Sequence, residues 1–111
     1  MLVDFNKIEE EKLMEFKGGK KFLAGKFHTD ELVKILKGRL EPGATVGKHT
    51  HEKDSEIIYV LSGTGKAFYD DGEERLVPGM CHYCPNGHAH GLENDGDEDL
   101  IFFAIVPVHK Q

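Results

Sequence analysis

Three histidines and one glutamate are the residues of this chain whose types and spacing best suit metal chemistry. His49 and His51 stand two residues apart in an extended segment, and side chains at that spacing point to the same face of a strand. Glu56 follows a short polar turn, and His90 follows a Pro-Asn-Gly turn. Imidazole and carboxylate groups that converge within a small β-structure bind borderline divalent metals. The sequence therefore predicts a metal site formed by His49, His51, Glu56 and His90.

The four ligands do not specify the metal. Mixed imidazole and carboxylate ligands suit manganese, iron, nickel, cobalt, zinc or copper. The alternative interpretation is that the four groups line a metal-free polar cavity or lie at the surface. We favour a divalent transition metal because several histidines in one pocket need partners for their ring nitrogens.

Two further histidines, His88 and His82, are candidates for supporting a metal ligand from behind or for moving a proton. His88 lies two residues before His90 and would share its strand face, although its place in a turn favours exposure to solvent. His82 lies in a strand segment and can face inward. We expect His28 and His109 at the surface. The sequence identifies no catalytic residue.

Cys81 and Cys84 have the C-x-x-C spacing that suggests zinc or redox chemistry. They lie in a segment that is expected to be a strand, where residues three apart face opposite ways. The chain also lacks the second pair of thiolates that a structural zinc site uses. We therefore expect packed, reduced thiols.

Length and charge restrict the possible partners. The chain has 111 residues and a formal net charge of −6 with its seven histidines neutral. This length suits one domain with a modest core. The negative charge disfavours nucleic acid and anionic membrane surfaces as partners. The first twelve residues hold no apolar stretch like that of a signal peptide, so we expect a cytoplasmic protein.

Short apolar stretches alternate with turn residues from residue 32 onward, at the spacing of an all-β sandwich or barrel. Residues 32–111 are therefore expected to form a β-barrel. Residues 1–31 are expected to form a less regular N-terminal segment of the same domain, with a short helix in 6–16 and an edge strand in 20–27. The barrel strands are expected at 32–40, 45–51, 56–61, 65–69, 73–77, 80–84, 89–93 and 100–106.

Two of the expected strands, 57–61 and 100–106, are apolar on both faces. Such strands are covered on both sides. One face would line the barrel, and the other would meet a second sheet or a second subunit. Because a chain of this length buries a limited surface alone, we favour a homodimer.

Ten positions at fixed spacing resemble the two sequence motifs of the cupins. The resemblance implies a single-domain cupin double-stranded β-helix, a jelly-roll barrel that usually holds one metal, with the same three histidines and glutamate as its ligands. Met80 stands where many cupins have an acidic residue, a departure that leaves the ligands unaffected. The first motif is formed by Gly43, His49, His51, Glu56 and Gly63, and the second by Gly79, Pro85, Gly87, His90 and Asn94.

The remaining motif residues have a structural explanation. Gly43, Gly63, Gly79 and Gly87 stand in turns, where glycine adopts a positive φ without steric cost. Asn94 precedes an Asp-Gly pair, and we expect it to form a turn rather than to take part in chemistry.

Two classes of function fit these observations. The first is a metal-dependent enzyme acting on a small oxygenated substrate, of the dioxygenase, decarboxylase or isomerase type that the resemblance to cupins includes. The second is a non-catalytic module that binds a small ligand or a metal. A purely structural metal ranks last, because structural zinc sites are usually closed and rich in thiolates. One scaffold hosts many chemistries, so the sequence does not decide whether the protein is an enzyme.

Overall fold

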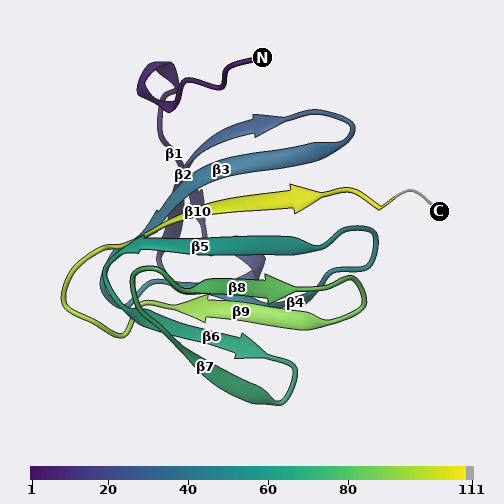
Figure 1. The fold of residues 1–111 in the computed structure, drawn as a ribbon. Coiled ribbons are helices and arrows are strands. Elements are labelled where there is room, and N and C mark those ends of the chain that lie inside the picture. The colour runs from purple at the N-terminus through teal and green to yellow at the C-terminus, as the bar shows by residue number, and fades with distance from the viewer. Residues whose placement is uncertain (110–111) are drawn as a thin grey trace.

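Two antiparallel sheets face each other in the computed structural model, which describes residues 1–109 (Figure 1). The six-stranded sheet has the order β1 (Glu11–Met14), β2 (Phe22–Thr29), β3 (Val33–Leu40), β10 (Leu100–Pro107), β5 (Glu56–Ser62) and β8 (Cys81–Cys84). The four-stranded sheet has the order β4 (Thr45–Thr50), β9 (Ala89–Glu93), β6 (Gly65–Tyr69) and β7 (Gly72–Leu76). This is the jelly-roll arrangement expected from the sequence, although the hydrogen-bonded strands form two open sheets and not one closed barrel.

The core lies between the two sheets and follows the alternation of side chains along each strand. In β10, Leu100, Phe102, Ala104 and Val106 are buried, and the residues between them are half-buried. In β5, Ile58 and Val60 are buried, whereas Tyr59 and Leu61 on the other face are exposed. Both strands carry apolar side chains on each face, but within the one chain the outer face of β5 lacks the cover that was expected.

The N-terminal segment differs from the sequence-based expectation. Where a short helix was expected in 6–16, the structure has a strand, β1 (Glu11–Met14), with a short 3-10 turn on each side, η1 (Phe5–Lys7) and η2 (Phe16–Gly18). Strand β1 takes the edge of the sheet and pairs with β2, so the expected edge strand is an interior one. Spacing alone could not reveal this, because pairing with a neighbouring strand decides the conformation of so short a segment. Residues 110–111, the end of the segment expected to form the barrel, lie outside the described residues.

Glycines and one asparagine shape the turns as predicted. Gly43, Gly63, Gly79 and Gly87 have φ values of 84°, 80°, 91° and 89°. The side chain of Asn94 is buried, donates from Nδ2 to the carbonyls of Leu40 and Glu98, and accepts from a nearby backbone N–H. Asn94 thus fixes the turn before β10.

The outer face of the six-stranded sheet exposes two tyrosines and one of the two cysteines. Tyr59 and Tyr83 are 45% and 55% exposed. Cys84 is buried as predicted, but Cys81 is exposed, because the two face opposite sides of β8. Both thiols are free. Among the described residues, no helix has the length and apolar character needed to cross a membrane.

Candidate metal centre

Two neighbouring strands of the four-stranded sheet, the loop after one of them and the start of a strand in the other sheet bring the four predicted ligand side chains together. His49 on β4 lies opposite His90 on β9, next to an irregularity in the register of these strands. His51 follows the end of β4, and Glu56 begins β5 in the other sheet. One potential ligand atom from each of the four residues lies within 4.8 Å of the others, so the cluster is compatible with a divalent metal.

An acidic neighbour fixes the orientation of the His51 ring. Its Nδ1 lies 2.6 Å from Asp54 Oδ1, and an ionised carboxylate can only accept a hydrogen bond. The Nδ1–H of His51 therefore donates to Asp54, and its Nε2 keeps a lone pair. That Nε2 lies 3.2 Å from Glu56 Oε1, inside the cluster.

A chain of two further residues fixes the tautomer of His90. His82 Nδ1 lies 2.8 Å from Glu74 Oε1, so the His82 ring donates to that carboxylate. Its Nε2 lies 2.9 Å from His90 Nδ1 and accepts the proton of that nitrogen. The Nε2 of His90 then keeps a lone pair, 3.0 Å from Glu56 Oε1. His82, only 3% exposed, thus supports a predicted ligand from behind.

The third imidazole is oriented by the backbone. His49 Nδ1 lies 2.8 Å from the carbonyl oxygen of Gly47, which also can only accept. All three rings therefore donate from Nδ1 and keep the lone pair on Nε2. In addition, the Nε2 atoms of His51 and His90 are only 2.9 Å apart. Lone pairs and a carboxylate crowded in this way need a cation or protons between them, which is the requirement that a metal ion meets.

Electrostatics within the cluster follow from the same contacts. Burial alone would raise the pKa of Glu56, but where protons take the place of a metal on the Nε2 atoms that face it, hydrogen bonds from His51 and His90 outweigh burial and hold this pKa at about 2. The hydrogen bond with Glu56 raises the pKa of His51, and Asp54 adds to that effect. Burial lowers the pKa of His49. Glu56 is therefore an anion, and protons compete with a metal chiefly at His51.

His88 occupies a different environment from His82. Its side chain is 44% exposed, and its Nδ1 lies 2.6 Å from Asp70 Oδ2. The ring also stacks on Tyr69 at a centroid distance of 5.5 Å. Among the described residues, the side chain of His88 contacts a carboxylate and a tyrosine outside the four-residue cluster. His28 and His109 were both expected at the surface. In the structure His109 is exposed and His28 is half-buried.

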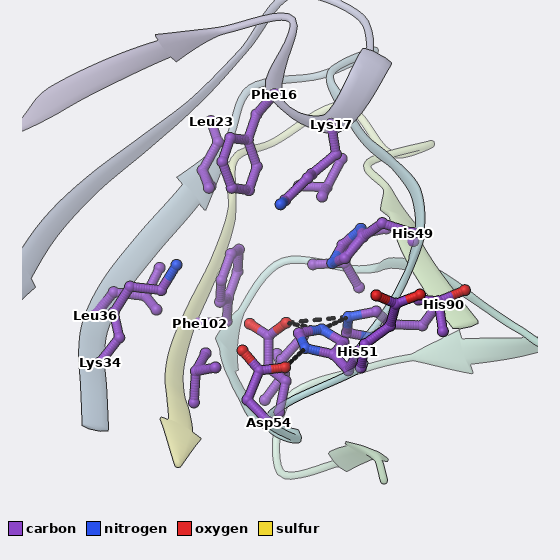
Figure 2. Close-up of a pocket in the computed structure, with 18 of the residues that line it drawn as sticks. Phe16, Lys17, Leu23, Lys34, Leu36, His49, His51, Asp54, His90 and Phe102 are labelled. Atoms are coloured by element: carbon purple, nitrogen blue, oxygen red, sulfur yellow. Dashed lines mark hydrogen bonds and ion pairs between the residues drawn. The ribbon is translucent and has the colours of Figure 1, made fainter. Parts of the chain in front are cut away.

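A cavity of about 270 Å³ opens over the cluster (Figure 2). The walls between its two ends are apolar, and they include Leu36, Val46, Ile58 and Phe102. Its volume lies just below the range of about 300–1,000 Å³ typical of drug-sized ligands, so it suits a small molecule. Open coordination positions of a bound metal would face this space.

Sequence reasoning missed several residues of the site. Asp54 and Glu74 orient two of the imidazoles, and Phe16, Lys17 and Lys34 line the cavity far from the histidines in sequence. A carboxylate three residues after His51 was a visible signal for Asp54. No spacing indicated the other four, because they come from separate strands and from the irregular N-terminal segment.

Known proteins resemble this chain in sequence and in fold. An oxalate-binding protein of Thermotoga maritima is 31% identical over 113 residues, covering 96% of this chain and 93% of that protein. The oxalate decarboxylase of Bacillus subtilis is also 31% identical, over 89% of this chain but only 28% of the enzyme's length. A solved structure described as a predicted oxalate decarboxylase of Thermotoga maritima has a TM-score of 0.91 at 27% identity, covering 97% of this chain and 99% of that chain.

The family model of the cupin domain matches residues 36–106, which is more than half of the chain. This segment contains all four residues of the cluster and both sequence motifs. The chain therefore belongs to the cupin family.

Proposed function

We propose that the protein holds one divalent transition metal through His49, His51, Glu56 and His90, and that it binds oxalate or a similar small carboxylate in the adjoining cavity. One observation carries this proposal: each of the three rings has its Nδ1 proton engaged elsewhere, which leaves three lone pairs and one carboxylate directed at a common point. The relatives named for oxalate binding and oxalate decarboxylation support the class of ligand.

The chain's own residues would provide the binding site for the ligand. A bound divalent metal would act as a Lewis acid that polarises a carboxylate oxygen. The apolar walls of the cavity offer few groups that bind water, and a drier environment would strengthen electrostatic interactions at the metal. Asp54 and Glu74 hold the rings in the metal-binding tautomer. These are features of a binding site, and they require no turnover.

Two steps test the proposal. Elemental analysis of protein purified without added metal should find about one divalent ion per chain. Titration calorimetry should then show that oxalate binds the metal-loaded protein and not the protein treated with a chelator. The variant Glu56→Ala should lose metal and oxalate together, whereas Glu93→Ala, outside the cluster, should lose neither. Oxalate binding that survives removal of the metal would refute the proposal.

Decarboxylation is the second candidate function, and Glu52 is the observation that favours it. This glutamate lines the cavity beside His51, whereas Asp54 and Glu56 are engaged with imidazoles. Cleavage of the carbon–carbon bond of oxalate releases carbon dioxide, and a proton must replace it to give formate. In such a reaction, Glu52 would deliver that proton. Formate production by the metal-loaded protein, lost in Glu52→Gln with oxalate affinity retained, would establish this activity.

We also propose that the protein is a homodimer. The outer face of the six-stranded sheet presents Ile57, Tyr59, Tyr83, Phe103 and Ile105 across strands that are neighbours in the sheet. A contiguous apolar face of this kind is typical of an interface. Sedimentation should give the mass of two chains at micromolar concentration, and Tyr59→Lys should shift it to one. A wild-type monomer would contradict this proposal.

A further inference from the structure

The cavity over the metal cluster has a second charged end. Two lysines, Lys17 and Lys34, line the cavity together with Phe16, opposite the histidines (Figure 2). Lys17 comes from the 3-10 turn η2, and Lys34 comes from β3. In Figure 2 the nitrogen of Lys17 points toward the space between Phe16 and His49, and Lys34 extends from the opposite wall.

The turn that carries Lys17 is fixed to the strand that carries His49. A side chain at Gly47 would collide with the carbonyl of Lys17, and one at Gly19 would collide with the carbonyl of Thr45, so the backbones lie in close contact. Lys17 itself has a φ of 56°, in the left-handed region that non-glycine residues rarely adopt. Packing against β4 thus holds Lys17 over the cavity at some conformational cost.

The Phe16 ring lies next to both ammonium groups. The Nζ atoms of Lys17 and Lys34 lie 5.5 Å and 5.9 Å from the centroid of the Phe16 ring. A phenyl face attracts an ammonium group only weakly. Among residues 1–109, neither ammonium forms an ion pair or a side-chain hydrogen bond. The two ammonium groups beside the Phe16 ring therefore have no negatively charged partner within residues 1–109.

The charges that line the cavity would favour a dianion once a divalent metal is bound. The formal charges of the lining side chains cancel, so the metal would give the cavity a net charge of about +2. The apolar walls between the two ends offer hydrocarbon contact and few hydrogen-bonding groups, which disfavours a sugar. The lining contains three lysines and three carboxylates, namely Lys17, Lys34, Lys53, Glu52, Asp54 and Glu56.

We propose that the cavity takes a dicarboxylate whose two carboxylates are separated by a short hydrocarbon chain. One carboxylate would bind the metal, the other would lie between Lys17 and Lys34, and the hydrocarbon would contact Leu36 and Phe102. Both carboxylates of oxalate would instead lie at the metal, because they are directly bonded. This inference rests on the proposed metal site and extends the class of ligand beyond oxalate.

Matched pairs of ligands test the proposal. Titration calorimetry on the full chain loaded with Zn²⁺, which has no redox chemistry, would compare malonate with propionate, glutarate with pentanoate, and adipate with hexanoate. At one chain length or more, we expect the dicarboxylate to bind at least about fivefold more tightly than its partner. If no dicarboxylate binds more tightly than its monocarboxylate partner at any chain length, the proposal is overturned. This comparison uses the wild-type chain and does not depend on the folding of any variant.

Variants then assign the advantage to the two lysines. In Lys17→Met and Lys34→Met, the preference for the dicarboxylate should shrink, and in the double variant it should vanish. Oxalate affinity should change less than about twofold, because oxalate does not reach the lysines. Lys37→Met is the matched control, since Lys37 lies on the same strand as Lys34 but is exposed on its outer face. A preference that survives in the folded double variant would overturn the proposal.

The two proposals fail in different ways. A wild-type chain that binds neither Zn²⁺ nor oxalate would refute the metal site, and this inference with it. A chain that binds both, but shows no dicarboxylate preference, would refute this inference alone. Circular dichroism verifies the fold of each variant, and Lys17→Arg, which keeps the charge, should retain the preference.

Discussion

The hydrogen-bonded chain behind His90 gives a quantitative prediction about metal affinity. In His82→Phe, the ring that accepts the His90 Nδ1–H is replaced by one that cannot accept it. Because this site is buried, the proton would be left without a partner or the His90 ring would have to turn. We therefore expect weaker metal binding in a protein that still folds.

The magnitude follows from a single buried hydrogen bond. A buried donor left without a partner costs about 1–3 kcal/mol. Because tenfold in affinity corresponds to about 1.4 kcal/mol, the expected loss is about 5- to 140-fold. A similar loss, of about 10- to 100-fold, is typical when a residue that supports a metal-binding histidine is replaced. Glu74→Ala should cost less than about tenfold, since the Glu74 side chain is 49% exposed and water can replace it.

A competition titration against a chelator of known affinity measures this loss. His88→Ala is the matched control, because the His88 side chain contacts Asp70 and Tyr69 outside the cluster, and its metal affinity should match that of the wild type. His82→Gln should recover part of the loss, since the amide oxygen can accept from His90. A metal affinity of His82→Phe within twofold of wild type would refute the assigned tautomers.

Three further predictions concern pH, thiol reactivity and stability. Metal affinity should fall between pH 7 and pH 5, and the decline should begin above the ordinary imidazole value because the pKa of His51 is raised; affinity that is constant over this range would contradict the histidine ligands. Maleimide should label exposed Cys81 rapidly and Cys84 only on unfolding, because Cys84 is buried and burial raises its pKa to about 11; equal rates would contradict this placement. Asn94→Ala should lower the free energy of unfolding by about 2–4 kcal/mol in urea denaturation, since the buried carbonyl of Leu40 and the partly buried hydrogen bond to Glu98 lose their donor, and a loss below about 0.5 kcal/mol would count against that role.

The strands and the four clustered residues were accessible from the sequence because local rules govern them. Turn residues bound the strands, and alternation along a strand puts His49 and His51 on one face. The two cupin motifs add positions that turn geometry requires, such as the positive φ of Gly43. These signals lie within short stretches of chain.

The remainder of the site was not accessible because it depends on which strands become neighbours. Glu74 reaches the cluster only through His82, and Lys17 reaches the cavity only because η2 packs on β4. The N-terminal segment was also misassigned at the sheet edge, since its apolar residues keep no clear period. Pairing between distant segments decided each of these positions.

Anomalous diffraction from crystals of the metal-supplied protein tests the central claim most directly. Data collected at the absorption edge of the metal found by elemental analysis should show one strong peak. We expect that peak at about 2.0–2.2 Å from Nε2 of His49, His51 and His90 and from a carboxylate oxygen of Glu56. Density in which these four side chains point apart, or a metal peak only at other residues, would contradict the account.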